Sequence, residues 1–210
     1  MSNMSKKREK YRRQQRRTAY HEAGHVVACE ELDVFYLSVS VDPNLRDGTA
    51  GRTAMGEGDE IDIPPGADPD DPRIVAAALR QAFTQAVVDY AGHAAMVAVL
   101  KQGRWTDRSA RFHGAWSDFE NAARCLLNDK ARIDEARARA LHIVTSRHDD
   151  VRRVAEALLK RGWLDLQHVG WVLSGRRVED FPEPPPPVED FPEPSRPARV
   201  RRRPSERGNR

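Results

Sequence analysis

Residues 18–28 of the chain read Thr-Ala-Tyr-His-Glu-Ala-Gly-His-Val-Val-Ala. His21 and His25 are four positions apart, and in a helix such residues are neighbours on one face, with Cβ atoms roughly 5–6 Å apart. That spacing allows two imidazole nitrogens to bind one tetrahedral Zn²⁺ ion. Glu22 lies about 100° around the helix from His21, which places it beside the metal as a candidate general base that takes a proton from water. The stretch therefore predicts a zinc-binding helix with a catalytic glutamate.

The residues around this motif are small or apolar, as expected of a helix that packs into a core. Gly24 is the exception, since glycine in a helix interior costs about 1 kcal/mol. We expect another backbone, for example the edge of a strand, to approach the helix closely at Gly24. The alternative interpretation is an exposed helix with two histidines of no function, and a third ligand is needed to exclude it.

Composition and charge predict one folded domain with basic ends. The 210 residues are enough for one hydrophobic core plus terminal extensions. The formal net charge is +3, but residues 1–17 contain eight Lys or Arg against one Glu, and residues 195–210 contain seven Arg against one Glu. The region between these ends is therefore acidic. Nucleic-acid binding through the Arg-rich ends is not favoured, because it would depend on charge alone.

Cysteine usage and hydropathy indicate a soluble, cytoplasmic protein. Cys29 and Cys125 form no disulfide framework, and we expect both to be reduced. Cys29 follows His25 by four residues, so a role as an additional ligand stays open, although burial as a small apolar residue is favoured. The N-terminus has no secretory signal, and charged or polar side chains interrupt the most apolar region, residues 74–100, so we expect no membrane span.

The order of apolar and turn-forming residues predicts a mainly α fold with a small β element of two to three strands. Helices are expected at 13–31, 72–101, 115–128, 133–147, 149–161 and 166–173, and strands at 34–41 and 51–55. Loops are expected at 56–72 and 103–114. Asp165 is the expected N-cap of the last helix. His93 lies within the helix at 72–101, where a role as a ligand can be imagined but a core or surface position is favoured.

The sequence divides the chain into three regions, which are a basic N-terminus, a folded domain and a C-terminal tail. Residues 1–12 are expected to be a basic, disordered N-terminus or a frayed extension of the first helix, and residues 13–175 form the folded domain. Residues 176–210 are expected to be a disordered, Pro-rich and Arg-rich tail. Within this tail the sequence Val-Glu-Asp-Phe-Pro-Glu-Pro at 178–184 recurs without change at 188–194. The repeat either presents two identical linear motifs to a partner or is a plain spacer.

The motif at 18–25 strongly resembles the zinc site of the FtsH-type ATP-dependent metalloproteases. Residues 89–95 look like the helix of that family that carries a Gly-Gly-Arg-Ala-Ala-Glu-like segment. Residues 114–122, Gly-Ala-Trp-Ser-Asp-Phe-Glu-Asn-Ala, are similar to its Gly-Ala-x-x-Asp-x-x-x-Ala segment, and residues 133–174 look like its closing helices. The resemblance covers roughly residues 13–175, in the same order.

This resemblance implies that His21, His25 and Asp118 bind zinc, with water or substrate in the fourth position, and that Glu22 is the catalytic base. The absence of a Gly-x-x-His after His25 argues against the metzincin class. The chain departs from the family at Met96-Val97, where the family has an acidic pair. It also has no Gly-x-x-x-x-Gly-Lys-Ser/Thr phosphate loop, and the family's transmembrane anchor is missing.

The sequence therefore predicts a zinc-dependent metalloendopeptidase-like domain that hydrolyses peptide bonds of unfolded or small protein substrates. Besides the polypeptide substrate, a separate ATPase or further copies of the chain are candidate partners. The alternative is a catalytically weak scaffold, or regulatory interaction protein, that uses a peptidase fold.

Overall fold

The computed structural model describes residues 3–41, 51–55, 68, 70–113 and 115–182 of the chain. The described residues are mainly helical and include a small three-stranded antiparallel sheet, which confirms the expected fold class. The elements are α1 (Asn3–Leu32), β1 (Tyr36–Ser40), β2 (Arg52–Met55), α2 (Pro72–Ala98), α3 (Asp107–His113), α4 (Trp116–Cys125), α5 (Lys130–Ser146), α6 (His148–Arg161), β3 (Trp163–Asp165), α7 (Leu166–Leu173) and the 3₁₀ helix η1 (Val178–Asp180). Among the described residues, no helix has the length and apolar character that crossing a membrane requires.

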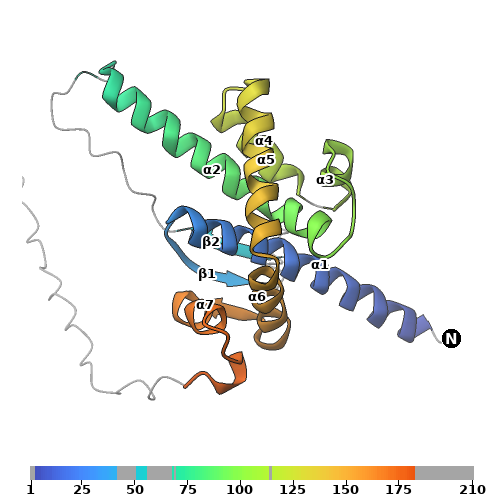
Figure 1. Ribbon diagram of the computed structural model, residues 1–210. Coiled ribbons are helices and arrows are strands. Elements are labelled where there is room, and N and C mark those ends of the chain that lie inside the picture. The colour runs from blue at the N-terminus through green and yellow to red at the C-terminus, as the bar shows by residue number, and fades with distance from the viewer. Residues whose placement is uncertain (1–2, 42–50, 56–67, 69, 114, 183–210) are drawn as a thin grey trace, which may run out of the picture.

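Helices α1 and α2 pack against each other at the centre of the molecule, with α5 against α2 and α6 against α1 (Figure 1). The contact between α1 and α2 is close because the facing residues are small. A Cβ atom at Gly24 would lie 2.4 Å from the carbonyl oxygen of Ala91 and 2.7 Å from Cβ of Ala95. The expected close approach at Gly24 is thus present, but the approaching backbone belongs to a helix and not to a strand edge.

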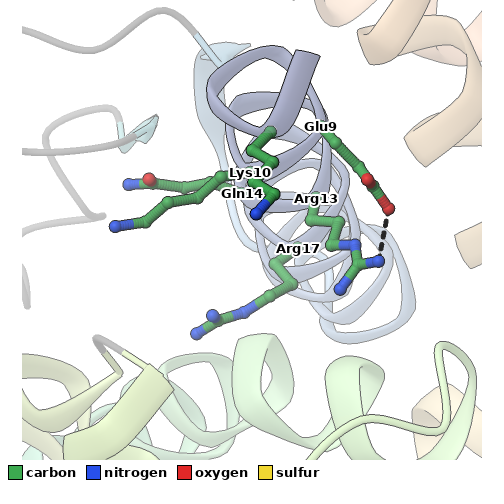
Figure 2. A pocket seen from close by; sticks show the side chains of 6 residues that line it. Glu9, Lys10, Arg13, Gln14 and Arg17 are labelled. Atoms are coloured by element: carbon green, nitrogen blue, oxygen red, sulfur yellow. Dashed lines mark hydrogen bonds and ion pairs between the residues drawn. The ribbon is translucent and has the colours of Figure 1, made fainter. Parts of the chain in front are cut away.

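Helix α1 begins at Asn3, about ten residues before the start expected from the sequence. Residues 3–12 are therefore helical. This agrees with the expected extension of the first helix and not with the alternative of a disordered segment. No proline or glycine interrupts the chain between Asn3 and Gly24. An ion pair between Glu9 and Arg13, one turn apart, also supports the helix (Figure 2).

The sheet has the order β2-β1-β3, so β1 is central and β2 lies at an edge. Val39 of β1 pairs with Thr53 of β2 and with Leu164 of β3. Tyr36 and Val39 are both buried although they are three residues apart, because a register shift between Tyr36 and Ser38 interrupts the regular alternation of the strand. The expected strands at 34–41 and 51–55 correspond to β1 and β2, and β3 is the third strand that the sequence did not locate.

Aspartates and one glycine set several helix ends. The side chains of Asp71 and Asp129 accept hydrogen bonds from backbone N–H groups at the starts of α2 and α5. Asp165 accepts a hydrogen bond from the N–H of His168 at 2.9 Å, which confirms its expected role as the N-cap of α7. Gly162 ends α6 with a φ of 79°, a left-handed conformation that suits glycine.

Two segments contain more regular structure than the sequence suggested. Residues 107–113 form α3 inside the expected loop at 103–114, and this short helix packs against α4 with Ala110 fully buried. The tail also begins later than residue 176, because the described chain runs to Pro182 and includes η1. The expected loop at 56–72 and the repeat copy at 188–194 lie mostly or wholly outside the described residues.

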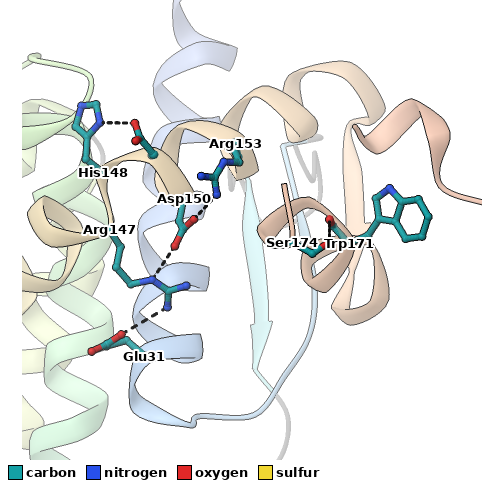
Figure 3. A network of polar contacts seen from close by, with 8 residues as sticks. Glu31, Arg147, His148, Asp150, Arg153, Trp171 and Ser174 are labelled. Carbon is teal, nitrogen blue, oxygen red and sulfur yellow. Dashed lines mark hydrogen bonds and ion pairs between the residues drawn. The ribbon is translucent and has the colours of Figure 1, made fainter. Parts of the chain in front are cut away.

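A polar network fastens the junction of α5 and α6 to the end of α1 (Figure 3). Arg147 Nε donates to Asp150 Oδ2 at 2.8 Å, and its Nη1 lies 3.6 Å from Glu31 Oε2. Arg153 donates to the other oxygen of Asp150 at 2.6 Å. This network holds α6 along α1, the helix that carries the histidine motif.

Candidate metal centre

His21, His25 and Asp118 form one compact cluster. The two Nε2 atoms are 3.0 Å apart, and Asp118 Oδ2 lies 3.0 Å from Nε2 of His21 and 3.8 Å from Nε2 of His25. The two histidines come from one face of α1, and Asp118 comes from the first turn of α4. The structure thus brings together the three residues that the sequence singled out as ligands, and their donor atoms could hold a metal ion.

The cluster is largely buried. The exposed fractions of the side chains are 15% for His21, 11% for His25 and 22% for Asp118. The protein therefore shields most of the cluster from water, which strengthens the electrostatic interactions among its groups.

The backbone of α2 orients His25. Its Nδ1 lies 2.8 Å from the carbonyl oxygen of Val88, which can only accept a hydrogen bond, so Nδ1 carries the proton. In the neutral ring Nε2 then has a free lone pair, and it is directed at His21 and Asp118. A second partner that fixes the tautomer in this way is typical of histidines that bind metals.

The chemistry of the three donors fits a bound cation. Two imidazole nitrogens and a carboxylate oxygen direct lone pairs at the same small space. A single proton on His21 Nε2 could interact with only some of these lone pairs. Burial lowers the pKa of His21, but the hydrogen bond and the charge of Asp118 outweigh it, so this pKa lies above its ordinary value. Burial likewise raises the pKa of Asp118, yet His21 and His25 shift it below its ordinary value. Both pKa shifts favour an ionised Asp118 next to a positive charge, which is either a protonated His21 or a bound cation.

Gly92 of α2 lies directly beneath the two imidazole rings. A Cβ atom at this position would be 2.5 Å from Nε2 of His25 and 2.6 Å from Cε1 of His21. Only glycine leaves room for both rings. Helix α2 is continuous at Gly92, and this glycine permits the close approach of α2 to the candidate metal centre.

Glu22 lies beside the cluster and outside the set of three converging atoms. It is 6% exposed, and its Oε2 accepts a hydrogen bond from the Thr53 hydroxyl at 2.8 Å. A Cβ atom at Gly51 would lie 3.0 Å from its Oε1. The carboxylate of Glu22 is therefore held between α1 and the edge strand β2.

Asp89 of α2 adds a further negative charge close to the cluster. Burial raises its pKa to about 6, while a hydrogen bond from Gln85 and the charge of His25 oppose the shift. Gln85 donates to its Oδ1 at 2.8 Å. Asp89, Val88 and Thr53 have no signal in the sequence, because nothing there shows that residues of α2 and β2 face the histidines.

Two other candidate ligands lie outside the set of converging donor atoms. His93 is fully buried, with its ring stacked on Trp105 at a centroid distance of 5.6 Å and Nε2 lying 3.0 Å from the Arg104 carbonyl oxygen. Cys29 is also fully buried, with Sγ 3.9 Å from the sulfur of Met55, and burial raises the pKa of its thiol to about 12. Both residues belong to the core, as the favoured interpretation of each predicted.

Comparison of the sequence with models of protein families and with curated proteins finds no match. The geometry of the candidate metal centre and the sequence motifs of the chain are therefore the basis for proposing a function.

Proposed function

We propose that this chain is a zinc-dependent metallopeptidase domain of the FtsH type that hydrolyses peptide bonds in unfolded or small polypeptides. The observation that carries the proposal is the convergence of His21, His25 and Asp118 within one cluster, with the carboxylate of Glu22 beside it. The first three supply the ligands, and the fourth is the base that the motif requires. The resemblance of four ordered sequence segments to that family supports the same function.

The donor set favours zinc among the common metals. Two imidazoles and one carboxylate are a usual set for catalytic zinc, which keeps a fourth position for water or substrate. Magnesium and calcium prefer oxygen ligands, so a site with two nitrogen donors does not suit them. Zinc in this site would polarise the scissile carbonyl group and make water more acidic.

Glu22 is placed to move the proton in the reaction. Thr53 holds Oε2, which leaves Oε1 as the atom that takes a proton from the attacking water. The hydroxyl oxygen then adds to the carbonyl carbon of the peptide bond. Glu22 passes its proton to the leaving nitrogen as the C–N bond breaks, so one water is consumed and the carboxylate is restored.

The edge strand β2 offers a place for substrate. It lies at the end of the sheet order β2-β1-β3, and Thr53 connects it to Glu22. An extended peptide that pairs with the outer edge of β2, where no other strand of the described residues lies, would pass beside the metal centre. Backbone hydrogen bonds would bind it without regard to most of its side chains. This mode suits unfolded substrates, and folded ones would need a separate ATPase that unfolds them.

The test is zinc content by elemental analysis together with cleavage of unfolded casein, for the wild type, Glu22→Gln and Asp118→Ala. We expect one zinc per chain and cleavage in the wild type, zinc without cleavage in Glu22→Gln, and strongly reduced zinc in Asp118→Ala. Absence of zinc in the wild type would exclude the proposed site. Zinc without cleavage in the wild type would instead favour the scaffold or regulatory interaction protein.

A further inference from the structure

The last described residues of the chain pack against α6 and α7. Val178 is 3% exposed, which is the burial of a core residue. Lys160 of α6 donates a hydrogen bond to Glu179 at 2.6 Å. An apolar and an acidic residue of the first repeat copy thus both have partners in the folded domain.

Phe181 contacts two aromatic side chains of α7. Its ring stacks on His168 at a centroid distance of 4.1 Å and meets the edge of Trp171 at 5.5 Å. His168 is buried and held in place by Asp165, whose Oδ1 lies 2.7 Å from its Nδ1. Trp171 lies on the outer side of α7, away from the Arg147–Asp150 network (Figure 3). A rigid aromatic surface therefore receives Phe181.

Arg177 takes part in these hydrogen bonds only through its carbonyl oxygen, which accepts. The indole N–H of Trp171 donates to the Arg177 carbonyl oxygen at 2.9 Å, and the N–H of Asp180 donates to the same oxygen at 3.1 Å. Arg177 has φ −80° and ψ 137°, a conformation that proline also adopts. Proline retains the carbonyl group, so it can replace arginine here without loss of these hydrogen bonds.

The second repeat copy has the same residues at the corresponding positions. Val188, Glu189 and Phe191 match Val178, Glu179 and Phe181, and Pro187 matches Arg177.

Three contacts of the first copy are specific to it, because prolines stand at the matching positions of the second copy. The guanidinium of Arg176 lies 4.2 Å from the centroid of the Trp171 ring, and the backbone N–H of Arg176 donates to the Trp171 carbonyl oxygen at 3.4 Å. Nη2 of Arg177 lies 3.8 Å from Glu179 Oε1. The second copy can therefore make the main contacts, with somewhat lower affinity.

We propose that Lys160, His168 and Trp171 form a docking site for the sequence Val-Glu-Asp-Phe-Pro, and that the two copies of the repeat exchange on it within one chain. Ten residues separate Trp171 from Phe181, and twenty separate it from Phe191. Doubling a flexible loop lowers the population of the closed state only about threefold. The first copy thus predominates, and the second takes its place when the first is damaged, so one copy of the motif always stays outside the docking site.

The experiment observes the imidazole C–H signals of His168 by NMR in the full chain, assigned with a His168→Gln variant. A phenylalanine ring stacked on His168 shifts these signals through its ring current. The variants are Phe181→Ala, Phe191→Ala and the double variant, with Phe35→Ala as a control because Phe35 is an exposed phenylalanine on the same domain. The signals of the other histidines report whether each variant is folded.

We expect the shift to be retained in Phe191→Ala, in Phe35→Ala and for the most part in Phe181→Ala, and to be lost in the double variant. Ending the chain after Pro187 in the Phe181→Ala background should also abolish it. A shift that is lost as completely in Phe181→Ala as in the double variant would overturn the proposal. Retention only at high protein concentration, with dimers in sedimentation, would show exchange between chains and overturn exchange within one chain.

Discussion

Gly92 is the residue on which the space for the two histidine rings depends. In Gly92→Ala the new methyl group would overlap both imidazoles. We expect zinc affinity, measured by competition with a chelating dye, to fall roughly tenfold or more, as when the support of a metal ligand is disturbed. The matched control is Gly170→Ala in α7, where no atom lies within 4 Å of the new Cβ. Equal affinity in both variants would contradict the described packing of α2 against the rings.

Thr53 holds the carboxylate of Glu22 and does not belong to the ligand cluster. Thr53→Val keeps the size and β-branched shape of the side chain but removes the hydroxyl that donates to Oε2. We expect cleavage to slow about tenfold, because the base loses its orientation, while zinc content stays at one per chain. Thr145→Val serves as the control, since the Thr145 hydroxyl bonds only the Leu141 carbonyl on the exposed side of α5. Loss of zinc in Thr53→Val would assign Thr53 a different role.

The residues of the metal centre differed in how far the sequence revealed them. His21, His25 and Glu22 were identified because their spacing has a direct meaning on a helix. Asp118 was identified only through resemblance, since spacing along the chain does not show that α4 meets α1. The Val88 carbonyl left no signal at all, because every residue has a carbonyl group and only the packing of α2 directs this one at His25.

At the scale of elements, α7 depends on the cap that Asp165 provides. Asp165→Ala should lower the free energy of unfolding by about 1 kcal/mol, the usual effect of removing an N-cap. Asp165→Asn retains the capping oxygen and should cost less. Urea unfolding of both variants measures these effects, and Asp134→Asn, at an exposed position on α5, is the control for loss of charge. Equal stability of the wild type and Asp165→Ala would contradict the cap.

The same residue predicts a dependence on pH. Partial burial raises the pKa of Asp165, but hydrogen bonds from the backbone and side chain of His168 outweigh it and place the pKa below 3.8. A lowered pKa contributes stability that is complete above the unfolded value and is lost as pH falls through the folded value. The stability difference between wild type and Asp165→Asn should therefore shrink as pH falls below about 4. A difference that grows on acidification would contradict this sign.

The elements that the sequence revealed have clear end signals, and most of them are long. Helix α2 was located from Pro72 and its apolar period, and α7 from Asp165 and Gly175. By contrast, α3 and β3 contain seven and three residues, too few to show a period, and their conformation follows from packing against α4 and β1. The segment at 178–182 has a polar, Pro-rich composition typical of disorder, yet its two apolar side chains have partners on the domain.

At the scale of the whole molecule, the metal centre joins elements that are distant in the chain. A zinc ion bound by His21, His25 and Asp118 would connect α1 to α4, so its removal should destabilise the entire domain. At a free zinc concentration of 100 times the dissociation constant, binding adds about 2.7 kcal/mol. We therefore expect 1,10-phenanthroline to lower the melting temperature by roughly 5–10 °C. Asp118→Ala should respond much less, and an unchanged melting temperature in the wild type would contradict zinc binding by the folded state.

Helix α1 carries the histidine motif in its second half, and its first half extends beyond the rest of the described domain (Figure 1). The residues from Asn3 to Arg17 span about 22 Å at the rise of an α-helix. Helix α1 is continuous from Asn3 to His21. A fluorophore or an affinity tag attached near residue 3 would therefore have a fixed orientation relative to the metal centre. Immobilisation through this end would therefore present every molecule on a surface with its metal centre in the same direction. The distance from such a label to the centre would be constant. It would therefore serve as the reference against which the distance to an approaching substrate is measured.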